Sequence, residues 1–374
     1  MKLTKKTKIV FCMNHIIMGG VEKVLCQYLL ALCNKHQYDL TVVSKKEITD
    51  PYFIDFFGRQ KIKLYDKIFC HRNKTHPFLL RLFHFILYKI TWQHIINNND
   101  IFIDFANCSF FYELKNIKKQ KVAWCHGSIN VYNQFLKRKL FNNTYNHIVF
   151  LSYSVINDIF LLEGISNPDK IICIYNPIDV SLVKKLASEN SSIRAVKRYF
   201  VAVQRLDNYD KSVSTIIKAF DLFIKKNKDI ELYIIGDGPD KKHLIDLAKN
   251  NTNIFFTGQL SNPYPIIKNA LALVLSSTKK IGEGLPNVIL EAQALETLVI
   301  ASDVKSGVRE ILMDGEAGIL FDAENEEALA EQLSYVVTNP LSCKQKIMNA
   351  SKYLYRFDVE ESVSKLEKII DNKT

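Results

Sequence analysis

The sequence predicts an α/β protein built from two Rossmann-like domains that face each other across a cleft. The chain has 374 residues, which at roughly 150 residues per domain suggests two domains. Hydrophobic residues make up 48% of it, enough for each domain to have its own core. Short runs rich in β-branched residues alternate with longer helical patterns along the whole chain. This alternation is typical of parallel sheets covered by helices.

The expected strands form one set in each half of the chain. They are residues 8–13, 40–43, 101–105, 121–124, 147–151 and 171–175 in the first half, and 199–203, 231–235, 254–257, 272–275 and 298–301 in the second. Helical stretches include residues 21–35, 212–227, 241–250 and 287–294.

The predicted domain boundary follows Asn176-Pro-Ile-Asp179. Its proline interrupts the preceding strand, and a polar stretch at 187–192 comes before the next one. We therefore expect four parts: an N-terminal domain over 1–178, an interdomain linker over 179–197, a C-terminal domain over 198–352, and a C-terminal helix over 353–374 that packs back on the N-terminal domain.

The cysteines indicate a reducing compartment. Eight occur without any Cys-x-x-Cys spacing, and most lie in apolar runs, where cysteine behaves as a small buried hydrophobe. A chain of this size does not need disulfides for stability. No signal cleavage pattern follows the basic start, and no run reaches the roughly 18 apolar residues of a membrane span. We expect a soluble or peripheral protein with free thiols.

Positive charge is concentrated in the first half of the chain. Residues 1–178 hold 24 Lys and Arg against 12 Asp and Glu, and the remaining 196 residues hold 26 against 27. A basic domain predicts an anionic partner, which is a nucleic acid, a phospholipid surface or a phosphorylated substrate.

The segment Phe78–Trp92 is aromatic and apolar, and it carries Arg81, His84 and Lys89. Basic residues beside Phe, Tyr and Trp suit a helix that lies in a bilayer interface. A buried core helix whose few polar residues reach solvent explains the same pattern equally well. The basic runs at 115–121 and 137–139 favour an anionic membrane surface, although each alone is typical of a solvated face.

The stretch Glu283-Gly-Leu-Pro-Asn-Val-Ile-Leu-Glu291 carries the strongest chemical signal. It follows an expected strand, Gly284 and Pro286 mark a tight turn, and proline suits the first turn of the next helix. The free N–H groups and dipole of that helix start predict an anion site. Glu283 and Glu291 suit sugar hydroxyls, which a carboxylate accepts strongly, although Glu291 also fits a solvent-facing position on an amphipathic helix.

Other strand ends supply cations, glycines and an imidazole. Arg205 and Lys211 follow one strand and are suited to a phosphate, although each alone is typical of a surface residue. Gly19 and Gly20 lie between an expected strand and helix, where they predict a second anion cradle. His126 follows another strand; a lone histidine is often structural, but ligands bind at this edge of an open α/β sheet.

Together these residues predict a nucleotide-sugar site in which cations and a helix start bind the diphosphate and carboxylates bind hydroxyls. The chain contains no Asp-x-Asp, so metal-bridged diphosphate binding has no obvious ligands. We expect no metal and no bound cofactor. Arg205, Lys211 and the helix dipole would then stabilise the leaving diphosphate unaided.

In these features the chain resembles family 4 of the retaining glycosyltransferases, enzymes of the GT-B fold. The resemblance is specific over roughly 195–325 and rests on Arg205, Lys211, the Glu-x7-Glu spacing from Glu283 to Glu291, and the motifs Val299-Ile-Ala-Ser-Asp303, Gly307-Val-Arg-Glu-Ile311 and Gly315-Glu-Ala-Gly-Ile-Leu320. The first half resembles the family more loosely, through Gly19-Gly-Val-Glu22, His126-Gly127 and Asn176-Pro-Ile-Asp179. Glu296-Thr297 departs from it, since the family commonly has a glycine there.

The resemblance implies a role for each site residue. Arg205 and Lys211 would stabilise the donor diphosphate, Glu283 would contact the donor sugar, and Glu291 would bind the ribose hydroxyls. The turn formed by Gly284, Leu285, Pro286 and Asn287 would face sugar and phosphate with its backbone N–H groups. Gly19 and Gly20 would leave room for diphosphate and acceptor. His126 would hydrogen-bond the donor sugar. Retention is explained in this family by attack from the same face, without a nucleophilic side chain.

The resemblance also implies a biological setting. The expected activity is transfer of a hexose or N-acetylhexosamine from a nucleotide sugar, with UDP favoured, to a glycan or lipid-linked saccharide. Relatives build bacterial surface polysaccharide (lipopolysaccharide, capsule or O-antigen). The expected location is cytoplasmic, peripheral at the inner face of the membrane, with the basic N-terminal domain on anionic lipid.

Two other functions remain open from the sequence. A nucleotide-sugar epimerase of similar fold would consume a sugar nucleotide without any acceptor. A non-enzymatic polyanion-binding protein would explain the basic half. We expect no nucleic-acid partner, because helix-turn-helix, zinc-finger and aromatic RNA-binding patterns are missing from the sequence.

Overall fold

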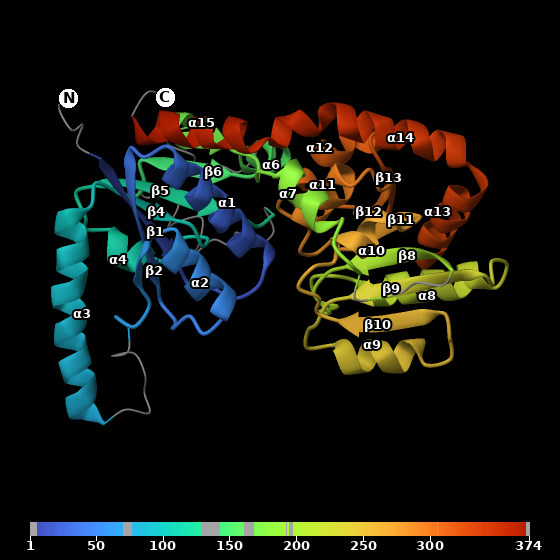
Figure 1. The fold of residues 1–374 in the computed structure, drawn as a ribbon, viewed down its shortest axis with the longest axis horizontal. Helices are drawn as coiled ribbons and strands as arrows, with labels where there is room; N and C mark the ends of the chain where they lie inside the picture. Colours follow the sequence, from blue (N-terminus) through green and yellow to red (C-terminus); the bar gives the residue numbers. More distant parts are fainter. Residues whose placement is uncertain are drawn as a thin grey trace.

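Two parallel sheets, each covered by helices, form the frame of the protein in the computed structural model (Figure 1). The structure describes residues 6–69, 77–128, 143–160, 168–191, 193, 197–304 and 306–371. The basic run at 137–139 lies outside these residues.

The first sheet has the strand order β3-β2-β1-β4-β5-β6-β7. Its strands are β1 (Thr7–Met13), β2 (Tyr38–Ser44), β3 (Lys63–Tyr65), β4 (Ile101–Asp104), β5 (Gln120–Cys125), β6 (His147–Phe150) and β7 (Ile171–Cys173). The second sheet has the order β10-β9-β8-β11-β12-β13. It consists of β8 (Arg198–Val203), β9 (Ile230–Ile235), β10 (Ile254–Gly258), β11 (Ala272–Leu275), β12 (Val299–Asp303) and β13 (Ile319–Asp322).

These sheets confirm the expected α/β architecture, and they add β3 and β13, which the sequence pattern did not predict. Both are short strands at sheet edges, where few β-branched residues are needed. The strand order reverses between β1 and β4 in the first sheet and between β8 and β11 in the second. Ligands of open α/β sheets bind outside the carboxyl ends of strands at such points.

The helices alternate with the strands. They are α1 (Gly20–Asn34), α2 (Pro51–Arg59), α3 (Phe78–Asn98), α4 (Phe111–Leu114), α6 (Tyr153–Phe160), α7 (Val180–Leu186), α8 (Val213–Ile224), α9 (Lys241–Ala248), α10 (Tyr264–Lys268), α11 (Asn287–Ala294), α12 (Gly307–Leu312), α13 (Glu326–Thr338), α14 (Pro340–Tyr353) and α15 (Val359–Ile370). Short 3₁₀ turns lie at Pro168–Lys170, Met313–Gly315 and Leu354–Phe357.

The chain crosses between the sheets twice, and the two crossing segments are bonded to each other. Ile178 pairs with Asp358 as an isolated parallel bridge, and its N–H donates to the Phe357 carbonyl at 2.8 Å. After the second crossing, α15 lies against the first sheet and its helices (Figure 1). There Glu367 takes an ion pair from Lys35 at 3.0 Å and a hydrogen bond from the Tyr38 hydroxyl at 2.9 Å.

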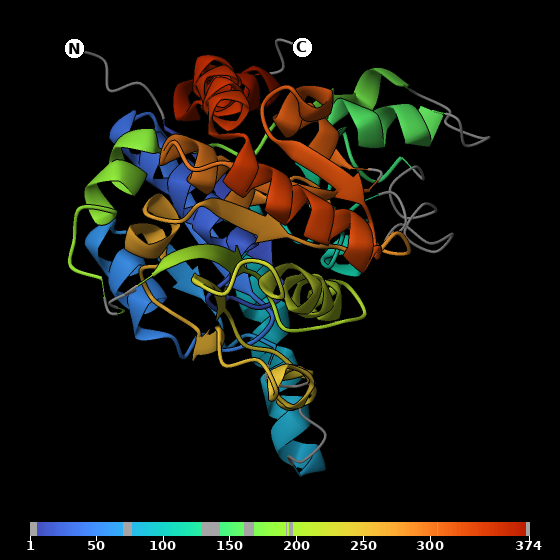
Figure 2. The same ribbon diagram turned by 90° about the vertical axis from the view of Figure 1, so that its right-hand side faces the viewer.

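The helix α3 departs most from an ordinary core helix. Only Tyr88, Trp92 and Ile95 are buried on it, whereas large apolar side chains from Phe78 to Ile90 are exposed. Its first turns stand clear of both sheets in two perpendicular views (Figures 1 and 2). The buried-helix interpretation of Phe78–Trp92 therefore fits only the second half of α3. Within the described ranges, no helix is long and apolar enough to cross a membrane.

Candidate functional site

The turn before α11 brings the two halves of the predicted site together. The Asn287 side chain donates to the Gly20 carbonyl at 2.9 Å, and the Asn176 side chain donates to Asn287 Oδ1 at 2.8 Å and to the Leu285 carbonyl at 3.2 Å. Gly20 begins α1 beside the switch point of the first sheet. Strand ends separated by more than 250 residues thus meet at one helix start.

Gly284 is a glycine because the two backbones touch at this point. A Cβ atom at Gly284 would overlap the carbonyl oxygen of His126, on the strand end opposite. The same peptide is fixed from behind, since the Gly307 N–H donates to the Gly284 carbonyl at 2.8 Å. Any larger residue would force the domains apart. Leu285 is buried and Pro286 caps the helix start, so α11 presents free N–H groups toward the first domain.

Lys211 and Glu283 form an ion pair at the centre of the second domain's carboxyl edge. The Ser277 hydroxyl also donates to Glu283. Both charged side chains are largely shielded, with 21% of the Lys211 side chain and 11% of the Glu283 side chain exposed. Because each charge neutralises the other, neither group carries the cost of an unpaired buried ion.

Arg205 lies on the same edge but is held by its own loop. Its guanidinium pairs with Asp207 at 2.8 Å and with Asp210, and 56% of the side chain is exposed. The loop itself is set by close packing of the β9 end, because a Cβ at Gly236 would overlap the Gln204 carbonyl. The exposed face of the guanidinium remains available to an anion.

Glu291 is buried, which excludes the solvent-facing interpretation of this residue. Its Oε1 accepts a hydrogen bond from the Tyr264 hydroxyl at 3.0 Å and faces Lys23 Nζ at 3.4 Å. Lys23 comes from α1, so this ion pair joins the two domains. Burial, and then the charge of Glu291, raise the pKa of Tyr264. The second carboxylate oxygen of Glu291 has the geometry to accept from a ligand hydroxyl.

His126 lies at the end of β5 with its ring edge against Phe105, the ring centroids 4.7 Å apart. Both ring nitrogens are buried, and neither has a hydrogen-bond partner among the residues that the structure describes. Burial lowers the pKa of His126 from 6.5 to about 4, so the ring is neutral at pH 7. Buried polar atoms without partners are rare in folded proteins. They indicate a place for a ligand hydroxyl.

Several residues of this site were not predicted from the sequence. Lys23, Asn176, Tyr264 and Ser277 all touch predicted site residues. Lys23 follows the Gly19-Gly-Val-Glu22 motif directly, and Asn176 begins another quoted motif, so both had a sequence signal. Tyr264 and Ser277 had none, because their partners are set by packing of the second domain. In the described part of the chain, no three His, Cys, Asp or Glu side chains are grouped as metal ligands.

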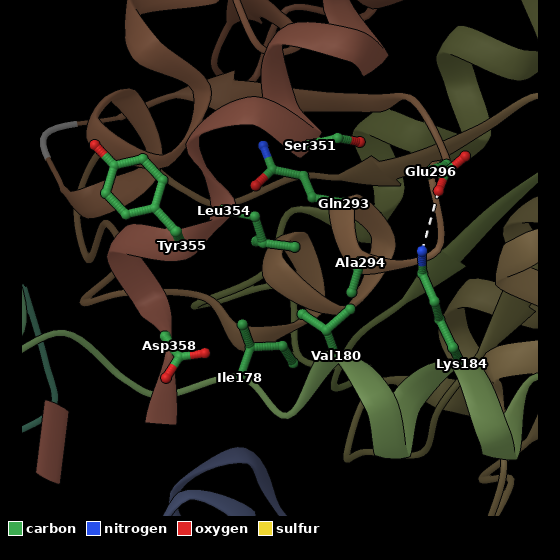
Figure 3. Close-up of a pocket in the computed structure, with 10 residues that line it drawn as sticks. All are labelled: Ile178, Val180, Lys184, Gln293, Ala294, Glu296, Ser351, Leu354, Tyr355 and Asp358. Atoms are coloured by element: carbon green, nitrogen blue, oxygen red, sulfur yellow. Dashed lines mark hydrogen bonds and ion pairs between the residues drawn. The ribbon is translucent and has the colours of Figure 1, made fainter. Parts of the chain in front are cut away.

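A hollow in the described surface lies at the other end of α11 (Figure 3). It is lined by side chains of the crossing segments, of α7 and of the α11 end: Ile178, Val180, Lys184, Gln293, Ala294, Glu296, Ser351, Leu354, Tyr355 and Asp358. Lys184 and Glu296 form an ion pair across its rim at 3.1 Å. None of the predicted site residues lines it. The predicted site is therefore separate from this pocket.

The chain is similar to several known glycosyltransferases. The model of the family described as "Glycosyl transferases group 1" matches residues 183–353. An uncharacterized glycosyltransferase of Haemophilus influenzae is 27% identical over 91% of this chain and 94% of its own length. A Campylobacter jejuni N-acetylgalactosaminyltransferase that acts on a diphospho-undecaprenol-linked saccharide, by its name, is 29% identical over 45% of this chain. That match spans only 44% of the Campylobacter protein.

Solved structures match the whole fold. Anabaena Alr3699/HepE in complex with UDP superposes with a TM-score of 0.77 at 17% identity and covers 98% of this chain and 100% of its own. The lipopolysaccharide outer core galactosyltransferase WaaB gives a TM-score of 0.72 at 19% identity, with the same coverage. The chain has the GT-B fold. Its second domain matches the model of the group 1 glycosyl transferases.

The buried ring of His126 predicts a pH-dependent stability. Its pKa is lower in the folded than in the unfolded chain, so the unfolded state binds the extra proton and stability falls as the pH drops from 6.5 toward 4. The free energy of unfolding of the wild type, measured with urea, should fall by roughly 1 kcal/mol per pH unit between pH 6 and 5 because of this group. In His126→Asn, the free energy of unfolding should fall less steeply with falling pH, because this contribution is absent.

The matched control for this measurement is His94→Asn, since His94 is exposed on α3. It should keep the wild-type slope. Equal slopes for the wild type and His126→Asn would contradict a neutral, buried His126.

Proposed function

We propose that the chain is a retaining glycosyltransferase that moves a hexose or N-acetylhexosamine from a UDP-sugar to a hydroxyl of a glycan or lipid-linked saccharide. The proposal rests on the groups that lie together at the facing carboxyl edges of both sheets. They are the cations Arg205 and Lys211, the carboxylates Glu283 and Glu291, the start of α11 and the neutral imidazole of His126. The name of the Campylobacter relative and the UDP complex of HepE support this donor and acceptor class. The acceptor would belong to a bacterial surface polysaccharide; the names of a capsular polysaccharide glycosyltransferase and of the lipopolysaccharide galactosyltransferase WaaB support this class.

The donor diphosphate would be bound by exchange of ion pairs. Lys211 would break its ion pair with Glu283 and bind the phosphate instead. Glu283 would then accept a hydrogen bond from a sugar hydroxyl and keep its hydrogen bond from Ser277. Arg205 offers its exposed guanidinium face to the same diphosphate. The free N–H groups at the start of α11 add their dipole. Each charge that loses a partner in this exchange gains another.

The ribose would bind at Glu291 and the donor sugar at His126. Tyr264 and Lys23 occupy Oε1 of Glu291, which orients the other oxygen toward the ribose hydroxyls. The neutral ring of His126 offers one donor and one acceptor to the sugar without adding a charge beside the reacting carbon. Gly19 and Gly20 leave the first domain's edge open for diphosphate and acceptor.

The transfer step would proceed by same-face attack. The bond from the anomeric carbon to the diphosphate oxygen breaks, the acceptor oxygen bonds to the same face of that carbon, and the acceptor proton passes to the leaving phosphate. The developing negative charge lies between Arg205, Lys211 and the α11 start, which are positioned before reaction. We propose that no metal or other cofactor is needed, and no side chain acts as nucleophile.

Thermal unfolding with UDP, GDP and ADP, without added metal, tests the donor site. UDP at 100 times its dissociation constant should stabilise the intact chain by about 2.7 kcal/mol. Arg205→Ala and Glu291→Ala should lose most of this stabilisation, because each removes a direct contact to diphosphate or ribose.

Two controls match these variants. Arg198→Ala removes an exposed arginine at the opposite end of the same strand β8, and Glu327→Ala removes an exposed glutamate of α13. Both should keep the full UDP shift. No shift with any nucleotide, or equal losses in the controls, would contradict the proposed site.

Proton NMR of the product tests the reaction itself. With UDP-sugars and a panel of prenyl-diphosphate-linked saccharides, the new glycosidic linkage should have the anomeric configuration of the donor. Inversion would contradict same-face attack. Conversion of the sugar nucleotide without any acceptor would identify an epimerase instead.

We further propose that the protein works in the cytoplasm, peripheral at the inner face of the membrane, with its basic N-terminal domain on anionic lipid. The exposed residues Lys89, Lys115 and Lys118 belong to this domain. Each basic residue near an anionic surface contributes about 1 kcal/mol. Replacing all three with Glu should weaken cosedimentation with phosphatidylglycerol-containing vesicles by roughly a hundredfold.

The same charge change in the C-terminal domain serves as the control. Lys225, Lys226 and Lys228 are also exposed, and their replacement with Glu should weaken vesicle binding far less. Equal effects of the two triple variants would show that net charge, and not the N-terminal domain, governs binding.

A further inference from the structure

The first half of α3, here called the projecting half, stands clear of both sheets. The helix has 21 residues, about 31 Å at 1.5 Å per residue. The part that precedes the buried Tyr88, residues 78–87, spans about 15 Å of this length. Figures 1 and 2 show this end of α3 pointing away from both sheets.

Aromatic packing fixes the other half of α3 to the first domain. The Trp92 ring lies 6.1 Å from Phe102 of β4 and 6.1 Å from Phe110, centroid to centroid. The Tyr88 ring lies 5.2 Å from Phe69. These contacts anchor the second half of α3 to the first domain.

The projecting half is apolar over most of its circumference. Nine large side chains between residues 78 and 90 are 39–77% exposed: Phe78, Leu79, Leu80, Leu82, Phe83, Phe85, Ile86, Leu87 and Ile90. At 100° per residue they cover an arc of roughly 220°. The exposed Lys89 lies within this arc near the end of the segment, where its long side chain can reach the headgroups. The remaining arc holds the half-buried Arg81 and His84 and the buried Tyr88. An exposed apolar surface of this extent marks a binding site.

We propose that residues 78–90 of α3 insert into the acyl region of one leaflet of an anionic phospholipid bilayer. A second copy of the helix would cover one face, whereas the 220° arc needs an apolar medium around it. The length of about 15 Å ahead of Tyr88 matches the ~15 Å of one hydrocarbon leaflet. No acidic residue occurs between Lys67 and Asn99, in a domain with 12 more basic than acidic residues over 1–178. Such a segment meets no repulsion at an anionic surface.

Insertion would hold the first domain at the membrane surface. An acceptor saccharide on a lipid carrier lies at that surface. This link to a lipid-linked acceptor rests on the proposed function, whereas insertion itself does not.

Flotation with phosphatidylcholine–phosphatidylglycerol vesicles tests insertion on the full chain. Replacing Leu79, Phe83, Ile86 and Ile90 with Ser removes the centre of the apolar arc and leaves the charge unchanged. We expect vesicle affinity to fall at least about tenfold. The matched control replaces four exposed apolar residues of the C-terminal domain with Ser, namely Leu222, Ile245, Leu341 and Met348. It should bind vesicles as the wild type does.

A depth measurement separates insertion from surface binding. In Phe83→Trp, the introduced indole should be quenched by phospholipid brominated within the acyl chain, whereas an indole introduced by Phe255→Trp in the C-terminal domain should not. Absence of quenching at position 83, or unchanged binding of the four-Ser variant, would overturn the proposal. So would a wild-type dimer in solution that the four-Ser variant converts to a monomer, because a second copy would then cover the helix.

Thermal unfolding with UDP distinguishes this proposal from the proposed function. The four-Ser variant should keep the wild-type UDP shift, since α3 is remote from Arg205 and Glu291. Loss of vesicle binding with an intact UDP shift supports insertion. Quenching at position 83 in a chain that shows no UDP shift would leave insertion standing and refute the donor site.

Discussion

The site depends on one close approach, where the Gly284 backbone meets the His126 carbonyl. A single Cβ atom at Gly284 would separate these backbones. Their contact sets the start of α11 against the first domain, and the Asn287 side chain then ties that start to Gly20 and Asn176. Two independently built sheets thereby share one functional edge. The domain contact and the anion site are the same piece of structure.

Ion pairs both stabilise this edge and give it groups that can bind a ligand. Lys211 pairs with Glu283, and Lys23 pairs with Glu291 across the domains. An isolated buried charge would cost several kcal/mol, so pairing stabilises the shielded carboxylates of Glu283 and Glu291. A nucleoside diphosphate sugar carries both anionic oxygens and hydroxyls. Its anionic oxygens can therefore replace a carboxylate beside a lysine, and its hydroxyls can donate to a glutamate. His126 differs because its pKa is already lowered to about 4 by burial and it has no charge to compensate.

Sequence reasoning predicted what depends on local order in the chain. The alternation of strands and helices gave the two sheets, and residues that follow strands were expected at the same edge because parallel strands end together. Contacts such as Lys23 with Glu291 were missed, since they require the relative placement of two domains. The exposure of α3 was also undecided, because an all-apolar segment looks the same whether protein or lipid surrounds it. The spacing of Arg81, His84, Tyr88 and Trp92 places them on one face of α3, and this face is the one that packs against the first domain.

A crystal structure of the intact chain with UDP tests the central claim most directly. The account predicts the diphosphate within hydrogen-bond distance of Arg205, Lys211 and the α11 start, with the ribose hydroxyls on Glu291 and the Lys211–Glu283 pair broken. A nucleotide bound elsewhere, or bound while that ion pair stays intact, would contradict the account.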